Sequence, residues 1–170
     1  TSTVSVANGG VICQNKGTFH MYGGTITGGK ATKAADQNKY GGGGVYVGGG
    51  TFHMHGGTIT GCTASENGGG VYLNSGTFTV SGSTKITGNT VNGKENNVYL
   101  PASKTITAAG LTSGAQIGVT TETKPTTTTV SITGANDADI HGCFTSDDSA
   151  YEPWNGTDTA VVLRTARMTP

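Results

Sequence analysis

Three histidines and a tyrosine are the residues of this chain whose types and spacing point most directly to chemistry. His53 and His55 lie two positions apart in Thr-Phe-His-Met-His, and His20 and Tyr22 hold the same places in an earlier copy, Thr-Phe-His-Met-Tyr. Residues i and i+2 of a β-strand share a face, so the spacing predicts one outward patch of imidazoles and a phenol. Three imidazoles on one face suit a transition metal such as zinc. The alternative is a solvated ladder, and we expect the ladder without metal or cofactor because no Asp or Glu in these strands orients the rings.

A second set of aromatic residues recurs at a regular interval. Tyr46, Tyr72 and Tyr99 are the central residues of Val-Tyr-Val and Val-Tyr-Leu triplets that are 26 and 27 residues apart. Alternation predicts that these tyrosines point outward as a ladder. Aromatic rings with a polar tip suit sugar rings and protein surfaces, although Tyr is also an ordinary strand residue that stacks along a sheet. The predicted binding residues are this ladder together with His20, Tyr22, His53 and His55.

Carboxylates are scarce where a polysaccharide-cleaving site would need them. Such a site requires paired carboxylates or a calcium–carboxylate cluster with a basic residue. The segment Val11 to Leu100 holds only Asp36, Glu66 and Glu95, so we predict no catalytic residue. Asp147-Asp148 further along is compatible with calcium, but a solvated turn is the simpler interpretation.

The elements that position these residues are internal repeats. The segment GTFHMYGGTITG at Gly17 to Gly28 returns as GTFHMHGGTITG at Gly50 to Gly61 and, with one insertion, as GTFTVSGSTKITG at Gly76 to Gly88. A second motif recurs with the same period: the triplets Val45-Tyr46-Val47, Val71-Tyr72-Leu73 and Val98-Tyr99-Leu100. Val11-Ile12-Cys13 is the predicted first copy of this triplet. Each period of about 26 residues holds three short β-like runs, which predicts the coils of a solenoid.

Composition supports an all-β repeat protein. The 170 residues include 30 Gly and 31 Thr, two types that disfavour helices, and Leu, Ile, Val and Phe make up only 29 residues. A narrow core is predicted from the inward positions of the strands, with Phe19, Phe52 and Phe78 stacked inside. The formal net charge is zero, which argues against a nucleic-acid partner. No apolar run reaches the roughly 20 residues of a membrane span.

The repeats resemble a known family. The pattern GGGVYL, SGTFTVSGSTKITGN and NNVYLP, followed by SKTIT and SGAQIGVTTE, is similar to right-handed parallel β-helix repeats of secreted, surface-attached Gram-positive bacterial proteins within the pectate-lyase-like superfamily. The resemblance covers roughly Val11 to Glu122. It implies that the protein is extracellular, as adhesins are. It does not assign a function, because proteins with this fold have many different roles.

The resulting expectation is an all-β, right-handed parallel β-helix of about four to five coils with three short strands per coil. Residues 1–170 form one domain, with repeat coils in 1–122 and a final irregular coil and cap in 123–170, where Trp154 is the expected anchor. The expected function is non-catalytic: adhesion or domain display, with a glycan or protein surface as partner, within a larger multidomain protein. The first alternative is a polysaccharide lyase or glycosidase.

Two further features suggest other binding roles. Thr25, Thr58, Thr27 and Thr60 predict two columns of outward threonines, which resemble the ice-facing surface of some β-solenoid antifreeze proteins; Lys85 interrupts one column. The corner from Gly29 to Gly44 is seven residues longer than its copy and carries Lys30, Lys33, Lys39 and Tyr40. That corner is an acid-binding loop or, as we expect, a plain surface loop.

Overall fold

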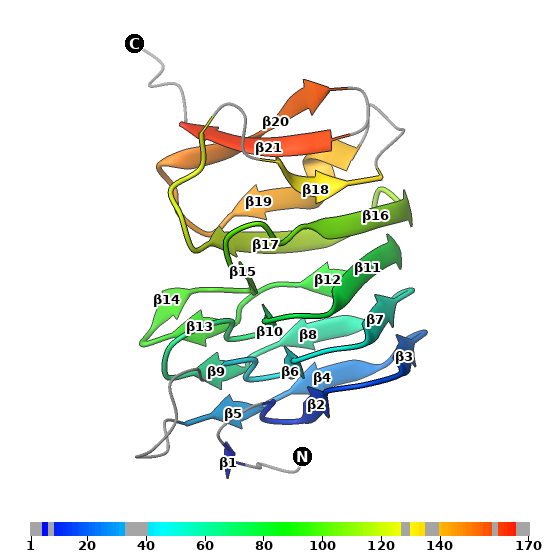
Figure 1. Ribbon diagram of the computed structural model, residues 1–170, viewed down its shortest axis with the longest axis vertical. Helices are drawn as coiled ribbons and strands as arrows, with labels where there is room; N and C mark the ends of the chain where they lie inside the picture. The colour runs from blue at the N-terminus through cyan, green and yellow to red at the C-terminus, as the bar shows by residue number, and fades with distance from the viewer. Residues whose placement is uncertain are drawn as a thin grey trace.

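The computed structural model describes the backbone of residues 5–6, 9–32, 41–126, 130–134, 140–157 and 160–165, and the side chains of 9–32, 41–126, 131–134 and 142–153. The described chain is all-β, with parallel strands stacked as in a β-solenoid. Figure 1 shows the strands as rungs that rise from the N-terminal end at the bottom to the C-terminal end at the top. No helix among the described residues has the length and apolar character needed to cross a membrane.

Three columns of strands correspond to the three predicted runs. The first column contains β2 (Ile12–Gln14), β6 (Val45–Val47), β10 (Val71–Leu73) and β15 (Val98–Leu100). The second contains β3 (Thr18–Met21), β7 (Thr51–Met54), β11 (Thr77–Gly82), β16 (Ile106–Leu111) and β18 (Val130–Thr133). The third contains β4 (Thr25–Thr27), β8 (Thr58–Thr60) and β12 (Lys85–Ile86), and β17 (Gln116–Thr121) pairs with both β12 and β15.

The register within the columns confirms most of the repeat alignment. Phe19 pairs with Phe52 and Phe52 with Phe78, while Tyr46 pairs with Tyr72 and Tyr72 with Tyr99. The predicted first copy of the triplet is wrong by one residue. Ile12 rather than Val11 pairs with Val45, and Val11 is 47% exposed. The inward position on β2 therefore belongs to Ile12, which a simple match to the following triplets did not reveal.

A fourth column corrects the expectation of three strands per coil. The short strands β1 (Ser5–Val6), β5 (Lys30–Ala31), β9 (Thr63–Ala64) and β13 (Thr90–Val91) pair in parallel, and β14 (Lys94–Glu95) pairs antiparallel with β13. Each is only two residues long, too short for alternation to show in the sequence. This column lies along the left of the stack in Figure 1.

The C-terminal region is more regular than the expected irregular cap. After the 3-10 helix η1 (Ile140–Cys143), β19 (Phe144–Ser146) adds a parallel rung to β17. The strands β20 (Tyr151–Thr157) and β21 (Ala160–Thr165) then form an antiparallel pair, and β21 lies antiparallel on β18. Antiparallel pairing thus ends the parallel stack of the second column.

The core is the narrow apolar interior that alternation predicts. Phe52, Met54, Ile59, Val71 and Phe78 are fully buried. The Phe52 and Phe78 rings stack at 4.9 Å between centroids, and Phe19, which is half-buried, continues the stack at 5.2 Å. Residues of one type therefore fill equivalent positions of successive coils, and each coil gains its core by packing on its neighbours.

Candidate functional site

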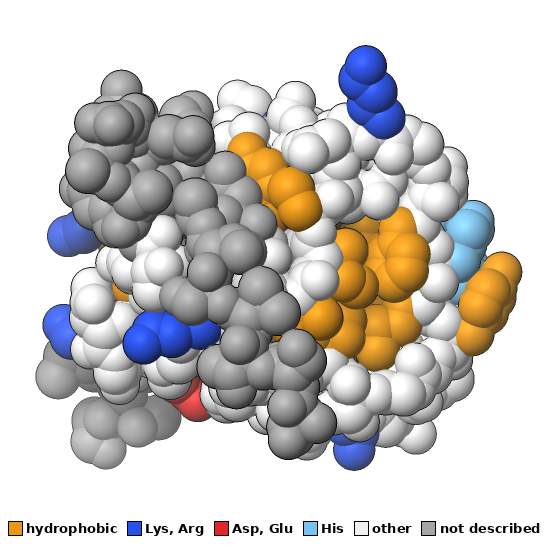
Figure 2. Space-filling view, turned by 90° about the horizontal axis from the view of Figure 1, so that it is seen from below, with side chains coloured by type: hydrophobic (Ala, Val, Ile, Leu, Met, Phe, Trp, Pro, Cys, Tyr) orange, Lys and Arg blue, Asp and Glu red, His pale blue; other side chains and the backbone are white. Residues whose placement is uncertain are grey.

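The histidine–tyrosine patch, defined here as His20, Tyr22, His53 and His55, assembles as the sequence predicts. The pairing of β3 with β7 places His20 beside His53. Their rings are nearly parallel, with centroids 4.9 Å apart, and the Tyr22 ring stacks on the His55 ring at 4.6 Å. Tyr22 is 74% exposed. Figure 2 views the molecule from its N-terminal end: apolar side chains fill the centre, and histidine lies at the margin beside a hydrophobic side chain.

A linear hydrogen-bonded relay runs through this patch. His20 Nδ1 lies 3.0 Å from His55 Nε2, and His55 Nδ1 lies 3.2 Å from the Ser81 hydroxyl oxygen. The 5.3 Å between the His20 and His55 ring centres equals the 3.0 Å between nitrogens plus one ring radius at each end. The two nitrogens therefore face each other along one line, so one donates its proton and the other accepts.

This arrangement does not favour the zinc interpretation. A metal ion needs lone pairs that converge on a common point, and the facing nitrogens of His20 and His55 point at each other instead. Across the described residues, no group of three or more His, Cys, Asp or Glu side chains is arranged to hold a metal ion. The patch, as it stands, offers hydrogen-bonding nitrogens and aromatic rings.

The surroundings of His53 disfavour its charged form. Burial lowers the pKa of His53 from its usual value, and the neighbouring His20 and His55 imidazoles lower it further because like charges repel. A lowered pKa favours the neutral imidazole. His53 therefore contributes a hydrogen-bonding ring to the patch more than a positive charge.

The tyrosine ladder forms, but the prediction that it lies exposed is wrong. Tyr46 is 9% exposed and Tyr72 only 3%, while Tyr99 is half-buried. Their rings pack edge-to-face at 5.6 and 5.5 Å. A Cβ atom on Gly41 would lie 2.4 Å from the Tyr72 ring, so the glycine backbone passes directly over that ring. Alternation correctly places the tyrosines away from the core, but it does not reveal that the Gly41 backbone lies against Tyr72.

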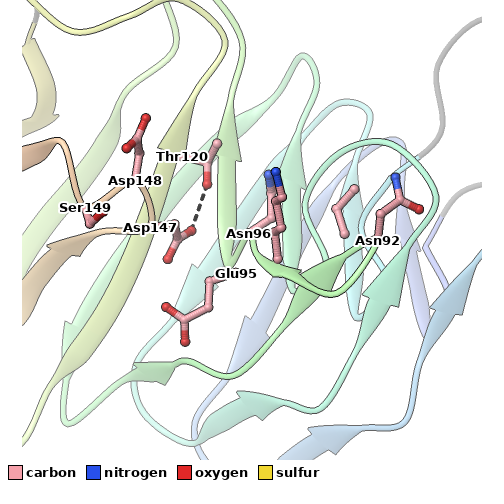
Figure 3. Close-up of a pocket in the computed structure, with 9 residues that line it drawn as sticks. Asn92, Glu95, Asn96, Thr120, Asp147, Asp148 and Ser149 are labelled. Carbon is pink, nitrogen blue, oxygen red and sulfur yellow. Dashed lines mark hydrogen bonds between the residues drawn. The ribbon is translucent and has the colours of Figure 1, made fainter.

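A polar groove lies at the C-terminal side of the repeat coils. It encloses about 780 Å³ and is lined by the β13–β14 hairpin and the residue after it, by β17 and by the segment after β19. The lining residues are Val91, Asn92, Lys94, Glu95, Asn96, Thr120, Asp147, Asp148 and Ser149. Figure 3 shows Glu95 and Asp147 near one another and Asp148 farther along. Sequence reasoning left Glu95 and Asp147 unconnected because they lie far apart along the chain.

Asp147 is the most strongly held carboxylate in this groove. Its oxygens accept hydrogen bonds from the Asn97 backbone N–H at 2.6 Å, from Asn97 Nδ2 at 2.7 Å and from the Thr120 hydroxyl at 2.8 Å. Burial raises the pKa of Asp147 and the charge of Glu95 raises it further, whereas the three hydrogen bonds oppose this rise. Asp147 therefore joins the segment after β19 to the corner before β15.

Several other predicted features have a definite place, and some fall outside the described residues. Thr25 pairs with Thr58, and Thr27 with Thr60, so the two threonine columns exist on β4 and β8, while Lys85 continues the first. The loop residues Lys33, Lys39 and Tyr40 and the side chain of Trp154 lie outside the described parts. Their predicted roles stay predictions.

The side chain in contact with the patch that sequence reasoning missed is Ser81. The third repeat copy places Ser81 where the first two have Tyr22 and His55, which was a signal available in the sequence. Only the hydrogen bond to His55 turns that substitution into a chemical contact. Comparisons of this chain with family models, with curated proteins and with solved structures found no match.

Proposed function

We propose that this protein is a recognition module that binds a glycan through the histidine–tyrosine patch. The observation that carries the proposal is the Tyr22 ring, which is 74% exposed and supported from one side by the His55 ring at 4.6 Å. Tyr22 follows β3, which is the edge strand of its sheet among the described strands. A ring that is held in place and open to solvent provides a stacking surface at low entropic cost.

The composition of the patch favours a glycan over other partners. A sugar ring offers an apolar C–H face for stacking and hydroxyl groups for hydrogen bonds. The imidazoles of His20 and His53 supply hydrogen-bonding nitrogens beside the Tyr22 ring, whereas both nitrogens of His55 contact His20 and Ser81. The lowered pKa of His53 favours its neutral imidazole, which suits a neutral ligand better than a phosphate.

A glycan array with matched variants tests this proposal. We expect Tyr22→Ala to weaken binding of any glycan hit by about tenfold, the size of an aromatic contact of about 1 to 1.5 kcal/mol. Tyr22→Phe keeps the ring and should keep most of the affinity, and Tyr99→Phe is the control outside the patch. Equal binding by Tyr22→Ala and the wild type, with both folded, would exclude this face. If no glycan on the array binds, a protein surface becomes the expected partner.

The polar groove favours a second candidate, cleavage of a polysaccharide. Three carboxylates line it, and one of them, Asp147, has a raised pKa, the property of a general acid. The three hydrogen bonds on Asp147 assign it an equally good structural role, which is why this candidate comes second. Shortening of a glycan on long incubation, lost in Glu95→Gln, would support cleavage. No shortening of any bound glycan would remove it.

The proposal includes the finer fold class and the location that the repeats suggest. A right-handed parallel β-helix of about four to five coils, of the pectate-lyase-like type, is supported by the parallel columns and the near-constant pairing interval. A secreted or surface-attached bacterial adhesin is the setting suggested by the resemblance of the repeats. An ice-binding role for the Thr25, Thr27, Thr58 and Thr60 array is the remaining alternative, and ice-recrystallisation assays would test it.

A further inference from the structure

We propose that Ser81 is a nucleophile that accepts acyl groups from carboxylic esters, with His55 as its general base and His20 as a positioning residue. His20 lies on β3 and Ser81 on β11, and His55 directly follows β7, which pairs with both strands in the second column, on the right of Figure 1. Ser81 and His55 are half-buried and His20 is exposed, so a substrate can reach them from solvent. This activity goes beyond recognition and does not depend on the glycan proposal.

The geometry is that of a nucleophile, a base and a group that orients the base. Ser81 Oγ is 3.2 Å from His55 Nδ1, and His55 Nε2 is 3.0 Å from His20 Nδ1. When the His55 proton sits on Nε2, it is donated to His20 Nδ1, and His55 Nδ1 is free to accept the Ser81 proton. This tautomer is the one that a base requires, and His20 stabilises it through the hydrogen bond.

The backbone around Ser81 is built to hold that residue in place. β11 has an irregular register with β16 between Val80 and Gly82, so Ser81 sits at a bulge, a feature that redirects side chains. Thr84 is fully buried. Its hydroxyl oxygen lies 2.8 Å from the Ser81 carbonyl oxygen and 3.1 Å from the Met54 carbonyl oxygen, and these two oxygens are its hydrogen-bond acceptors. Gly82 has φ +57°, and a Cβ there would lie 2.4 Å from the His55 carbonyl oxygen. These contacts fix the Ser81 backbone against His55.

The reaction balances with water as the second substrate. Ser81 Oγ attacks the ester carbonyl carbon while its proton passes to His55 Nδ1. The carbon–oxygen bond to the leaving group then breaks, and the departing alcohol takes the proton from His55, which leaves acyl-Ser81. Water, deprotonated by His55, attacks the acyl group and releases the carboxylic acid, and Ser81 recovers its proton. The net change is ester plus water to acid plus alcohol.

The substrate class follows from what surrounds the nucleophile. His55 hydrogen-bonds to Ser81 through one ring nitrogen and stacks face to face with the Tyr22 ring, so His55 lies between Tyr22 and Ser81. A half-buried nucleophile suits an ester with a small acyl group. Where the glycan proposal also holds, the substrate is an O-acylated sugar.

Labelling with a fluorophosphonate probe tests the nucleophile directly. Attack by Ser81 Oγ forms an oxygen–phosphorus bond and expels fluoride, and peptide mass mapping locates the adduct. We expect Ser81 to be labelled at least tenfold faster than Ser83, its exposed neighbour. The adduct should be absent in Ser81→Ala and slowed at least tenfold in His55→Gln, the size of a general-base effect. Ser83→Ala is the matched control and should react as the wild type does.

Two readouts separate this mechanism from a merely structural role. His20→Gln should slow labelling a few-fold and displace its pH profile, because His20 acts by orienting His55. Reaction with 4-nitrophenyl acetate should transfer an acetyl group to Ser81. An acetylserine ester survives mass analysis, whereas an acetylated histidine hydrolyses too quickly to be detected. Labelling of Ser81 at the Ser83 rate, or as fast in folded His55→Gln as in the wild type, would overturn the proposal. Glycan binding that survives in Ser81→Ala would leave the recognition function intact.

Discussion

At the scale of single residues, the environment decides what a tyrosine can do. Tyr22, which follows β3, and Tyr72, on β10, are both predicted to point outward, yet Tyr22 is 74% exposed and Tyr72 is 3% exposed. Tyr72 packs edge-to-face with Tyr46 and Tyr99 beneath the Gly41 backbone. One residue type therefore serves as a stacking surface in one place and as packing in another.

The buried tyrosine gives a prediction about alkaline stability. Burial raises the pKa of Tyr72 to about 12, and the neighbouring Tyr46 and Tyr99 add to the rise. The unfolded value is about 10, so between pH 10 and 12 the folded state keeps a proton that the unfolded state has lost. Stability is full below pH 10 and falls as pH rises toward 12. Urea unfolding from pH 9 to 12 should show this slope, and Tyr72→Phe should flatten it. An unchanged slope in the variant would contradict burial of the hydroxyl-bearing ring.

At the scale of elements, strand alternation separates core from surface within one strand. On β7, Phe52 and Met54 are fully buried, whereas Thr51 and His53 are half-buried. The bulge in β11 then breaks strict repetition, and Ser81 replaces the aromatic residue of the earlier copies. The strands of this column therefore repeat their inward core residues, whereas an outward residue differs between copies.

Adjacent substitutions on β7 test that alternation. Phe52→Ala should lower the free energy of unfolding by about 3 to 5 kcal/mol, because it leaves a cavity between the Phe19 and Phe78 rings. His53→Ala should cost less than about 1 kcal/mol, because its ring is outside the core. Chemical denaturation measures both. Equal losses would mean that the register is shifted by one residue.

At the scale of the whole molecule, a few polar contacts tie the C-terminal part to the repeat coils. Asp147 accepts hydrogen bonds from Asn97, 50 residues earlier, and from Thr120. Asn97 is 2% exposed and in turn accepts hydrogen bonds at Oδ1 from the backbone N–H and the side chain of Asn89, also buried. A chain of buried amides thus ends on this carboxylate.

Removing the carboxylate tests that connection. Asp147→Ala should destabilise the protein by about 1 to 3 kcal/mol, because two Asn97 donors lose their acceptor in a buried place. Asp148→Ala is the matched control: Asp148 is exposed, and its loss should change stability by less than about 0.5 kcal/mol. Thermal and urea unfolding of both variants provide the measurement. A smaller loss of unfolding free energy for Asp147→Ala than for Asp148→Ala would show that the Asp147–Asn97 contact does not stabilise the fold.

The repeats made much of the fold predictable. Their period predicts parallel columns, and the alternation within Thr-Phe-His-Met predicts which side chains face inward; Phe52, Phe78 and Ile59 are fully buried as expected. The neighbourhood of His20 with His53 and of Tyr22 with His55 follows from the same period. The two-residue strands at the fourth corner and the position of Ile12 were missed, because neither carries a complete repeat pattern.

The sequence by itself determined the all-β class, the stacking interval and the two sides of each main strand, because these depend on local periodicity. Only the tertiary structure decided that Tyr72 is covered, that Glu95 and Asp147 share a groove, and that Ser81 meets His55. Each of these depends on the path of a loop or bulge between residues that are distant along the chain. A periodic pattern specifies what repeats, whereas binding and chemistry depend on the places where the repetition is interrupted.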